Sequence, residues 1–145
     1  MRTAILILLL GLCITIISCN NNGEESTYDI VDVEGLIMEI KEDSIFNTGL
    51  SIVIKNETEK EYLFEEFYCI EKKIDDKWYE VPRVVKNAAF HDLSINIEEE
   101  IEISWEWIYG KLKPGYYRII KSYIDWRATG DYDKYYISTD FIIGE

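Results

Sequence analysis

The stretch from residue 101 to residue 121, IEISWEWIYGKLKPGYYRIIK, constrains the fold of this chain more than any other part. Its first half alternates apolar and polar residues, with Ile101, Ile103, Trp105 and Trp107 on one face. A period of two is typical of a half-buried β-strand. The Pro114-Gly115 pair then predicts a tight turn, because proline fixes φ and glycine permits positive φ. The stretch therefore predicts a strand that carries both tryptophans, a corner and a second strand.

The residues around this turn resemble a recurring corner of β-sandwich proteins. Leu112, Pro114, Gly115 and Tyr117 together are similar to the tyrosine corner of immunoglobulin-like sandwiches. In such a corner the tyrosine hydroxyl donates a hydrogen bond to the backbone a few residues upstream. Tyr117 is expected to take this role, with Tyr116 on the opposite face of the strand.

Further strands are predicted by alternating apolar residues elsewhere in the chain. The alternation is clear at residues 36–40, 50–54 and 137–143, and residues 95–97 suggest a shorter strand. Residues 67–81 are typical of a hairpin, with Asp75 and Asp76 in the turn where Asp-Gly would be the stronger signal. Seven or eight strands without an amphipathic helix predict an all-β fold, an immunoglobulin-like antiparallel β-sandwich.

Several segments also resemble a known family. LSIVIKN (50–56), IEKK (70–73), KWYEV (77–81) and WIYGKLKPGYYRI (107–119) are similar to the bacterial immunoglobulin-like domain family found in exported lipoproteins. The resemblance covers residues 34–145, and the last of these segments is its most specific part. It implies a β-sandwich and carries over no catalytic residue. Asp76 stands where the family usually has glycine in this hairpin, which bears on the type of turn.

The first eighteen residues predict an export signal. Residues 4–17 are apolar apart from Gly11 and Thr15, and they are too few for a comfortable membrane span. They end in Ile16-Ile17-Ser18-Cys19, which resembles a bacterial lipobox. The resemblance implies that Cys19 is lipidated and that the signal is cut just before it. The alternatives are a plain signal peptide and an anchor helix that contains Cys19.

This interpretation divides the chain into three parts. Residues 1–18 are the signal peptide, residues 19–27 are the lipidated cysteine with a polar tether, and residues 28–145 are the immunoglobulin-like domain. A lipid anchor with two or more acyl chains holds a protein stably at a membrane. The protein is therefore expected outside the cytoplasm, anchored to the cell membrane or to an outer membrane.

The charge of the chain restricts its partners. The chain carries 15 basic and 28 acidic residues, and loss of residues 1–18 would remove Arg2 and leave a net charge of −14. Strong negative charge repels phosphate backbones and anionic lipid head groups, so no nucleic acid partner is expected. Membrane contact is expected through the lipid anchor alone. Cys69 is the one cysteine beyond Cys19, which excludes a disulfide within the domain, and the domain is expected to be monomeric.

Residues for catalysis are sparse. Cys69 and His91 could form a dyad, but Cys69 lies in an ordinary strand pattern, where cysteine packs as a small apolar residue. Acidic runs at residues 65–66 and 98–100 are more typical of solvated strand edges than of a glycosidase pair. Asp131 and Asp133 begin like a cation loop, but no closing glutamate follows at calcium-binding spacing. We therefore expect no enzymatic activity, no metal and no cofactor.

The stretch from residue 123 to residue 136, YIDWRATGDYDKYY, is expected to form a loop before the last strand. It gathers Trp126, Arg127, Tyr132 and Tyr135, which are residue types that binding surfaces favour. The alternative is that these aromatic side chains simply cover the rim of the core.

Taken together, these features predict a membrane-anchored extracytoplasmic lipoprotein with a non-enzymatic immunoglobulin-like domain. Its role would be to bind a protein or glycan of the cell envelope, or to serve as a structural part there. The alternative function is that of an inhibitor or regulator of an extracellular hydrolase, with a loop of the sandwich as the blocking element.

Overall fold

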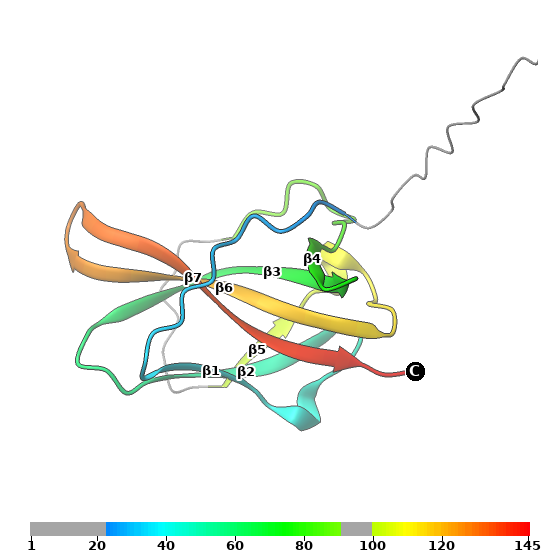
Figure 1. Ribbon diagram of the computed structural model, residues 1–145, viewed down its shortest axis with the longest axis horizontal. Coiled ribbons are helices and arrows are strands. Elements are labelled where there is room, and N and C mark those ends of the chain that lie inside the picture. Colours follow the sequence, from blue (N-terminus) through cyan, green and yellow to red (C-terminus); the bar gives the residue numbers. More distant parts are fainter. Residues whose placement is uncertain (1–22, 91–99) are drawn as a thin grey trace, which may run out of the picture.

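A computed structural model describes residues 23–90 and 100–145, which form two antiparallel β-sheets that face each other (Figure 1). One sheet has the strand order β1-β2-β5, and the other has the order β4-β3-β6-β7. The expected all-β, immunoglobulin-like sandwich is confirmed, with seven strands among the described residues. The elements in chain order are β1 (Leu36–Ile40), the 3₁₀ helix η1 (Glu42–Ser44), β2 (Gly49–Asn56), β3 (Tyr62–Ile74), β4 (Lys77–Glu80), β5 (Glu100–Ser104), α1 (Glu106–Tyr109), β6 (Gly115–Ala128) and β7 (Asp131–Ile143).

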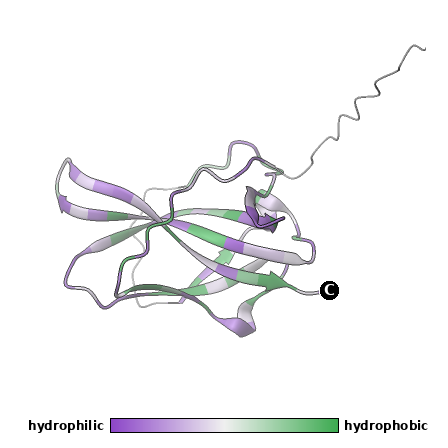
Figure 2. Cartoon of the chain, in the orientation of Figure 1, coloured by the Kyte–Doolittle hydropathy of each residue, from purple (hydrophilic) through white to green (hydrophobic). Residues whose placement is uncertain are grey.

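The core lies between the two sheets. Hydrophobic residues recur along the strands of both sheets (Figure 2). Since the side chains of a strand point alternately to its two faces, those of one face of each sheet can meet in the core. The largest fully buried side chain is that of Trp105, which follows β5. Its indole N–H donates to the carbonyl oxygen of Asn47 at 3.0 Å, and its ring lies 5.5 Å from that of Phe141 in β7. Trp105 therefore joins the two sheets.

The turn before β6 is held by Tyr117. Its hydroxyl donates a hydrogen bond to the carbonyl oxygen of Lys113 at 2.7 Å, which is the contact that defines a tyrosine corner. Its ring is buried and stacks on Phe141 with the centroids 5.6 Å apart. Gly115 does not have the positive φ that was expected. A Cβ at this position would lie 2.8 Å from Cε of Lys72, the flexible end of a side chain that can move aside.

The prediction of a strand that carries both Trp105 and Trp107 is wrong. β5 ends at Ser104, and the chain turns into α1, where the N–H groups of Ile108 and Tyr109 donate to the carbonyl oxygen of Trp105. The side chains three and four positions after Trp105 are then the buried ones, as in a helix. Trp107 points outward and is 51% exposed.

The prediction of a loop at residues 123–136 is also wrong. β6 runs to Ala128 and β7 begins at Asp131, so the two strands form a long hairpin. Its turn is tight, and Gly130 has a φ of +79°. Charged residues alternate with aromatic ones here, and neither face carries the apolar pattern that identifies a half-buried strand.

The hairpin expected at residues 67–81 is present as β3 and β4. Asp75 and Asp76 connect the two strands with φ values of 49° and 63°. Two central residues with positive φ are the feature of a type I′ turn, whose twist matches that of the flanking strands.

The N-terminal segment, residues 23–35, runs along the four-stranded sheet (Figure 1). The N–H of Ser26 donates to the carbonyl oxygen of Trp78 in β4 at 2.8 Å. The N–H of Val31 donates to the carbonyl oxygen of Tyr136 in β7 at 2.9 Å. The part of the expected tether from residue 23 onward therefore lies against the domain.

This segment covers the outer face of the four-stranded sheet. Cys69 and Ile120 are paired on β3 and β6 and lie outside the core cluster, yet both are fully buried. Tyr28 of the N-terminal segment packs over this face, with ring centroids 4.9 Å from Tyr136 and 6.2 Å from Phe67. Burial of the outer face thus depends on residues that precede the first strand.

Several sequence-based expectations concern residues that the structure does not describe. The signal peptide, Cys19, His91, the short strand at residues 95–97 and the acidic residues 98 and 99 lie outside the described ranges. Within residues 23–90 and 100–145, no helix has the length and hydropathy needed to cross a membrane.

Candidate functional site

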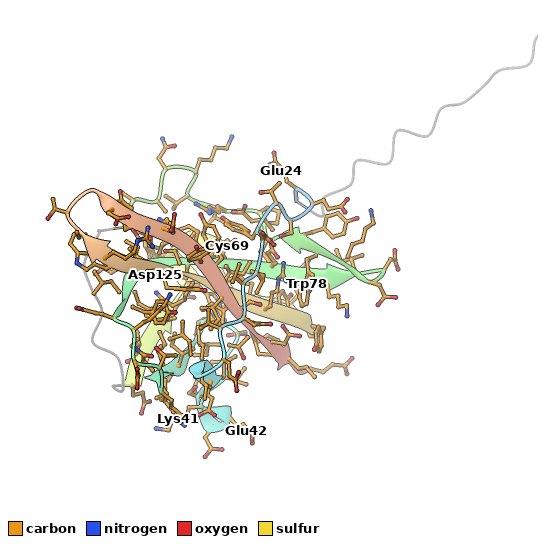
Figure 3. The ribbon with its side chains drawn as sticks, turned by 60° about the vertical axis from the view of Figure 1, so that its left-hand side comes forward. Glu24, Lys41, Glu42, Cys69, Trp78 and Asp125 are labelled. Carbon is orange, nitrogen blue, oxygen red and sulfur yellow. The ribbon has the colours of Figure 1, made fainter. Side chains whose placement is uncertain are left out.

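The strongest candidate for a binding site is the end of the sandwich formed by the tip of the β6–β7 hairpin. β3 pairs with β6 only as far as Asp125, so the hairpin beyond this residue projects as a two-stranded ribbon (Figure 1). The connection between β2 and β3 lies beside its base, where the ammonium group of Lys60 is 3.0 Å from the carboxylate of Asp125. Asp125 is seen at this base in Figure 3.

One face of the hairpin tip carries an exposed aromatic pair. Trp126 of β6 and Tyr132 of β7 are directly opposite each other. Their rings are nearly parallel, with an interplanar angle of 14° and centroids 6.3 Å apart. Trp126 is 36% exposed and Tyr132 is 51% exposed. The pair stabilises the hairpin by cross-strand contact and also presents apolar ring surface to solvent.

The charged side chains of the tip are paired with each other. The guanidinium group of Arg127 is 2.8 Å from the carboxylate of Asp131 and 2.9 Å from that of Asp133. Hydrogen bonds to these two carboxylates raise the pKa of Arg127 above its usual value. The two acids that resembled the start of a cation loop therefore bind an arginine. No group of three or more potential metal ligands occurs within the described part of the chain.

Below the tip, a cavity of about 460 Å³ opens between the hairpin and the β2–β3 connection. Tyr62, Tyr123 and Tyr135 line it, with both Tyr62 and Tyr135 5.6 Å from Tyr123 between ring centroids. The ion pair of Lys60 and Asp125 borders the same cavity. Glu34 also lines the cavity, which thus combines aromatic walls with one cation and two anions.

The hydroxyl of Tyr123 is held in its neutral form. Burial raises its pKa to about 12, and it donates a hydrogen bond to the carbonyl oxygen of Val31 at 3.2 Å. At neutral pH Tyr123 therefore carries no charge. The charged groups of this cavity are those at its rim.

Comparison with known sequence families decides what kind of domain this is. The family model described as a bacterial Ig-like domain matches residues 32–141, which include all seven described strands up to Phe141 of β7. The chain belongs to the bacterial Ig-like domain family. No curated protein and no solved structure matches it. Immunoglobulin-like sandwiches present binding residues at their ends, so the family is compatible with a non-enzymatic binding or structural role.

The fold of the Ig-like domain brings three of the four residues that the sequence suggested for binding together at the hairpin tip. Trp126 and Tyr132 share one face of the hairpin, and Arg127 is held by two carboxylates beside them. Tyr135 lies on the other face, half-buried against Tyr123. The alternative that these aromatics cover the rim of the core therefore describes Tyr135 but not the exposed pair.

Sequence reasoning missed Lys60, in the β2–β3 connection of the Ig-like domain, and Tyr62, the first residue of β3. The signal was the turn before them, Asn56-Glu57-Thr58. The Asn56 side-chain oxygen accepts hydrogen bonds from the N–H and the hydroxyl of Thr58, which makes a local Asx turn. This turn reverses the chain, so that β3 runs back along the sandwich. The position of Lys60 and Tyr62 beside the β6–β7 hairpin, however, depends on contacts between residues that are far apart in the sequence.

Cys69 has the surroundings of a packed residue. It is fully buried, and burial raises the pKa of its thiol to about 12. The thiolate is the nucleophilic form of cysteine and is scarce at neutral pH when the pKa is so high. Figure 3 shows Cys69 within the sheet, and His91, its suggested partner, lies outside the described residues.

Proposed function

We propose that this protein is a lipoprotein anchored at an extracytoplasmic membrane surface, and that its Ig-like domain binds a protein or glycan of the cell envelope without enzymatic activity. The observation that carries the proposal is the exposed Trp126–Tyr132 pair on a projecting hairpin. Large amphipathic rings supply much contact area at a low cost in conformational entropy. The neighbouring cavity with its three tyrosines enlarges the surface that a partner could contact.

The place where the described chain begins supports a domain whose hairpin tip faces away from the membrane. The N–H of Glu80 in β4 donates to the carbonyl oxygen of Glu24 at 2.8 Å, so the described chain begins beside β4. The hairpin tip lies at the opposite end of the molecule (Figure 1). If Cys19 carries the lipid, it is at most about 14 Å of extended chain from Gly23. The Trp126–Tyr132 pair would then point away from the membrane.

A second candidate function is the inhibition or regulation of an extracellular hydrolase. The observation that favours it is the two-stranded ribbon beyond Asp125, since a projecting, paired hairpin can enter a cleft with little loss of conformational freedom. In this case the captured partner would be an enzyme, and its activity would fall in the complex.

Capture from crosslinked envelopes by the wild type and by Trp126→Ala tests the proposed function. We expect the variant to lose about 2 kcal/mol or more of binding free energy, the effect of truncating an aromatic anchor. Its free energy of unfolding should fall by only about 0.5–1.5 kcal/mol, because one aromatic pair is lost at the surface. Capture and denaturant melts are measured on the same protein.

The matched control is Trp107→Ala, which removes an equally large exposed ring from α1, away from the hairpin. It should leave capture unchanged. Equal capture by the wild type and by Trp126→Ala would refute the binding role of the hairpin. Capture that survives protease treatment of the envelopes would identify a glycan, and loss of hydrolase activity in the captured fraction would favour inhibition.

A further inference from the structure

β7 is an outermost strand of its sheet, and among the described residues the N-terminal segment bonds to its backbone only at Tyr136. The N–H of Val31 donates to the carbonyl oxygen of Tyr136, so the backbone groups of Tyr136 point away from β6. Because successive residues of a strand direct these groups to opposite sides, those of Ser138, Asp140 and Ile142 also point away from β6. No backbone bond from these three residues to another element occurs within the described parts of the chain.

Natural proteins protect such edges, because unpaired backbone groups template the addition of another strand. This domain protects the edge of β4 through Glu24 and Ser26, and the middle of β7, at Tyr136, through Val31. The segment 138–142 is left open by the same N-terminal segment. It lies near the C-terminal end of β7, at the other end of the molecule from the hairpin tip (Figure 1).

The open part of β7 borders a groove between the two sheets. This edge groove has a volume of about 710 Å³, and its apolar lining consists of Met38, Ile40, Ile45, Phe141 and Ile142. Ile142 is 62% exposed. The backbone groups of Met38 and Ile40 in β1 also face the groove side, because those of Lys41 and Gly35 bond toward β2. Apolar surface thus lies next to unpaired backbone donors and acceptors.

The charge around the edge groove is negative. Glu42 and Asp140 line it, and so does Glu39, whose carboxylate is paired with the ammonium group of Lys55 at 2.6 Å. Glu145 lines the adjoining hollow. Glu42 stands at the surface in Figure 3. Among the described residues that line the two hollows there is no lysine or arginine. The net charge of the whole chain, −13, has the same sign.

We propose that the edge groove is a docking site for an extended, basic segment of a partner protein, which adds as a strand to β7 along residues 138–142. Backbone hydrogen bonds to Ser138, Asp140 and Ile142 supply the pairing. Alternate side chains of the added strand point into the groove and are apolar, and the others lie beside Asp140 and are basic. This is strand addition, a general mode of peptide recognition, and it uses a surface separate from the hairpin tip.

A second copy of this chain fits the groove less well. Antiparallel pairing of two β7 strands about a two-fold axis at Asp140 would place the two carboxylates directly opposite each other. Like charges in this position destabilise a strand pair. Two chains of net charge −13 also repel each other over a longer range.

The free edge is tested first, by hydrogen exchange of the full chain in detergent micelles followed by NMR. The amides of Ser138, Asp140 and Ile142 should exchange at least about tenfold faster than those of Ile137, Thr139 and Phe141, whose N–H groups face β6. Uniform exchange along the segment would mean that the edge is already paired and would overturn the proposal.

The second step adds a probe, the capped peptide Lys-Val-Lys-Val-Lys-Val-Lys. It should slow exchange at Ser138, Asp140 and Ile142, and the same peptide with glutamate in place of lysine should not. Ile142→Lys should weaken binding of the lysine peptide by about tenfold or more, since Ile142 lies on the same face of β7 as Asp140 and the change places a like charge beside the lysines of the peptide. The matched control is Val84→Lys, at a residue that is 68% exposed outside the groove, and it should leave binding unchanged.

Each other result speaks against the proposal. Equal slowing by the glutamate peptide, or equal weakening by Val84→Lys, would indicate non-specific association. Protection of Met38 and Ile40 in place of the β7 amides would put the added strand on β1. A dimer in sedimentation experiments that Ile142→Lys dissociates would show that the occupant is a second copy of the chain.

Discussion

At the scale of single residues, Tyr117 and Lys121 of β6 are buried polar side chains on the face that points between the sheets. Tyr117 places its ring in the core and its hydroxyl on the carbonyl oxygen of Lys113. Lys121 is almost completely buried, and its ammonium group is 3.3 Å from the carbonyl oxygen of Glu66. The first contact satisfies a neutral group, whereas the second leaves a cation in a poorly solvated place, so the two residues should affect stability in opposite directions.

Tyr117→Phe removes the hydroxyl and keeps the ring. We expect the free energy of unfolding to fall by about 0.5–1.5 kcal/mol, because the corner loses one buried hydrogen bond. Tyr116→Phe is the control, since its hydroxyl bonds the carboxylate of Asp140 at the surface and should contribute less. Equal losses for the two variants in urea melts would show that the Tyr117 hydroxyl does not hold the corner.

Lys121→Met should stabilise the domain at pH 7 by about 1–3 kcal/mol, because a buried cation is replaced by an apolar side chain of similar length. Burial lowers the pKa of Lys121 from 10.5 to about 8. A depressed pKa in the folded state means that the stability of the wild type falls as the pH drops from 10.5 through 8. The advantage of the variant should therefore be largest below pH 8 and shrink toward pH 10.5.

Denaturant melts between pH 7 and pH 10.5 measure this effect. The control is Lys111→Met, at an exposed lysine, which should show neither the gain nor its dependence on pH. A loss of stability in Lys121→Met at pH 7 would mean that the ammonium group has better partners than its surroundings suggest.

At the scale of elements, the two hairpins use different turn chemistry. The β6–β7 turn has Gly130 at positive φ, which costs glycine little. The β3–β4 turn has Asp75 and Asp76 at positive φ, a conformation that residues with a Cβ adopt only with strain.

Asp76→Gly should therefore raise the free energy of unfolding by about 0.5–1 kcal/mol, because the strain at positive φ is relieved. Asp76 is fully exposed, and its carboxylate is 3.9 Å from the ammonium group of Lys73, a long ion pair at the surface. Such a pair contributes little, so the substitution loses little else. Gly130→Ala provides the opposite test, since it adds a Cβ at a φ of +79° and should destabilise by about 1 kcal/mol. A destabilised Asp76→Gly variant would contradict the turn assignment.

At the scale of the whole molecule, the N-terminal segment has two tasks. It completes the fold by covering the outer face of the four-stranded sheet. In our proposal it also leads to the lipid anchor, so the distance between membrane and domain is short. The orientation of both proposed binding surfaces relative to the membrane depends on this link.

The lipid anchor predicts that the mature protein begins at Cys19 and carries acyl chains. Detergent-phase partitioning and intact-mass measurement of protein extracted from membranes check this. Cys19→Ser should abolish the added mass and release the protein from the membrane or leave its signal uncut. Recovery of an unmodified wild-type chain that retains residues 1–18 would refute the anchor.

Much of the fold was predictable from the sequence because the decisive signals are local. Strands β1 and β2 follow from apolar residues with a period of two, and the β3–β4 hairpin follows from its turn residues. The corner at Tyr117 follows from a short spacing of leucine, proline, glycine and tyrosine. Each of these features involves residues within a few positions of each other, so alternation and turn chemistry determine them.

The tertiary structure decided what depends on which segments become neighbours. Trp107 is exposed because the chain leaves the sheet at Ser104 and buries the residues at helical spacing from Trp105. Trp126 and Tyr132 form a pair because β6 and β7 continue beyond the sheet, where neither face has a core to indicate a strand. The tyrosine cavity and the edge groove join segments far apart in sequence, and their positions follow from strand order, which no local pattern encodes.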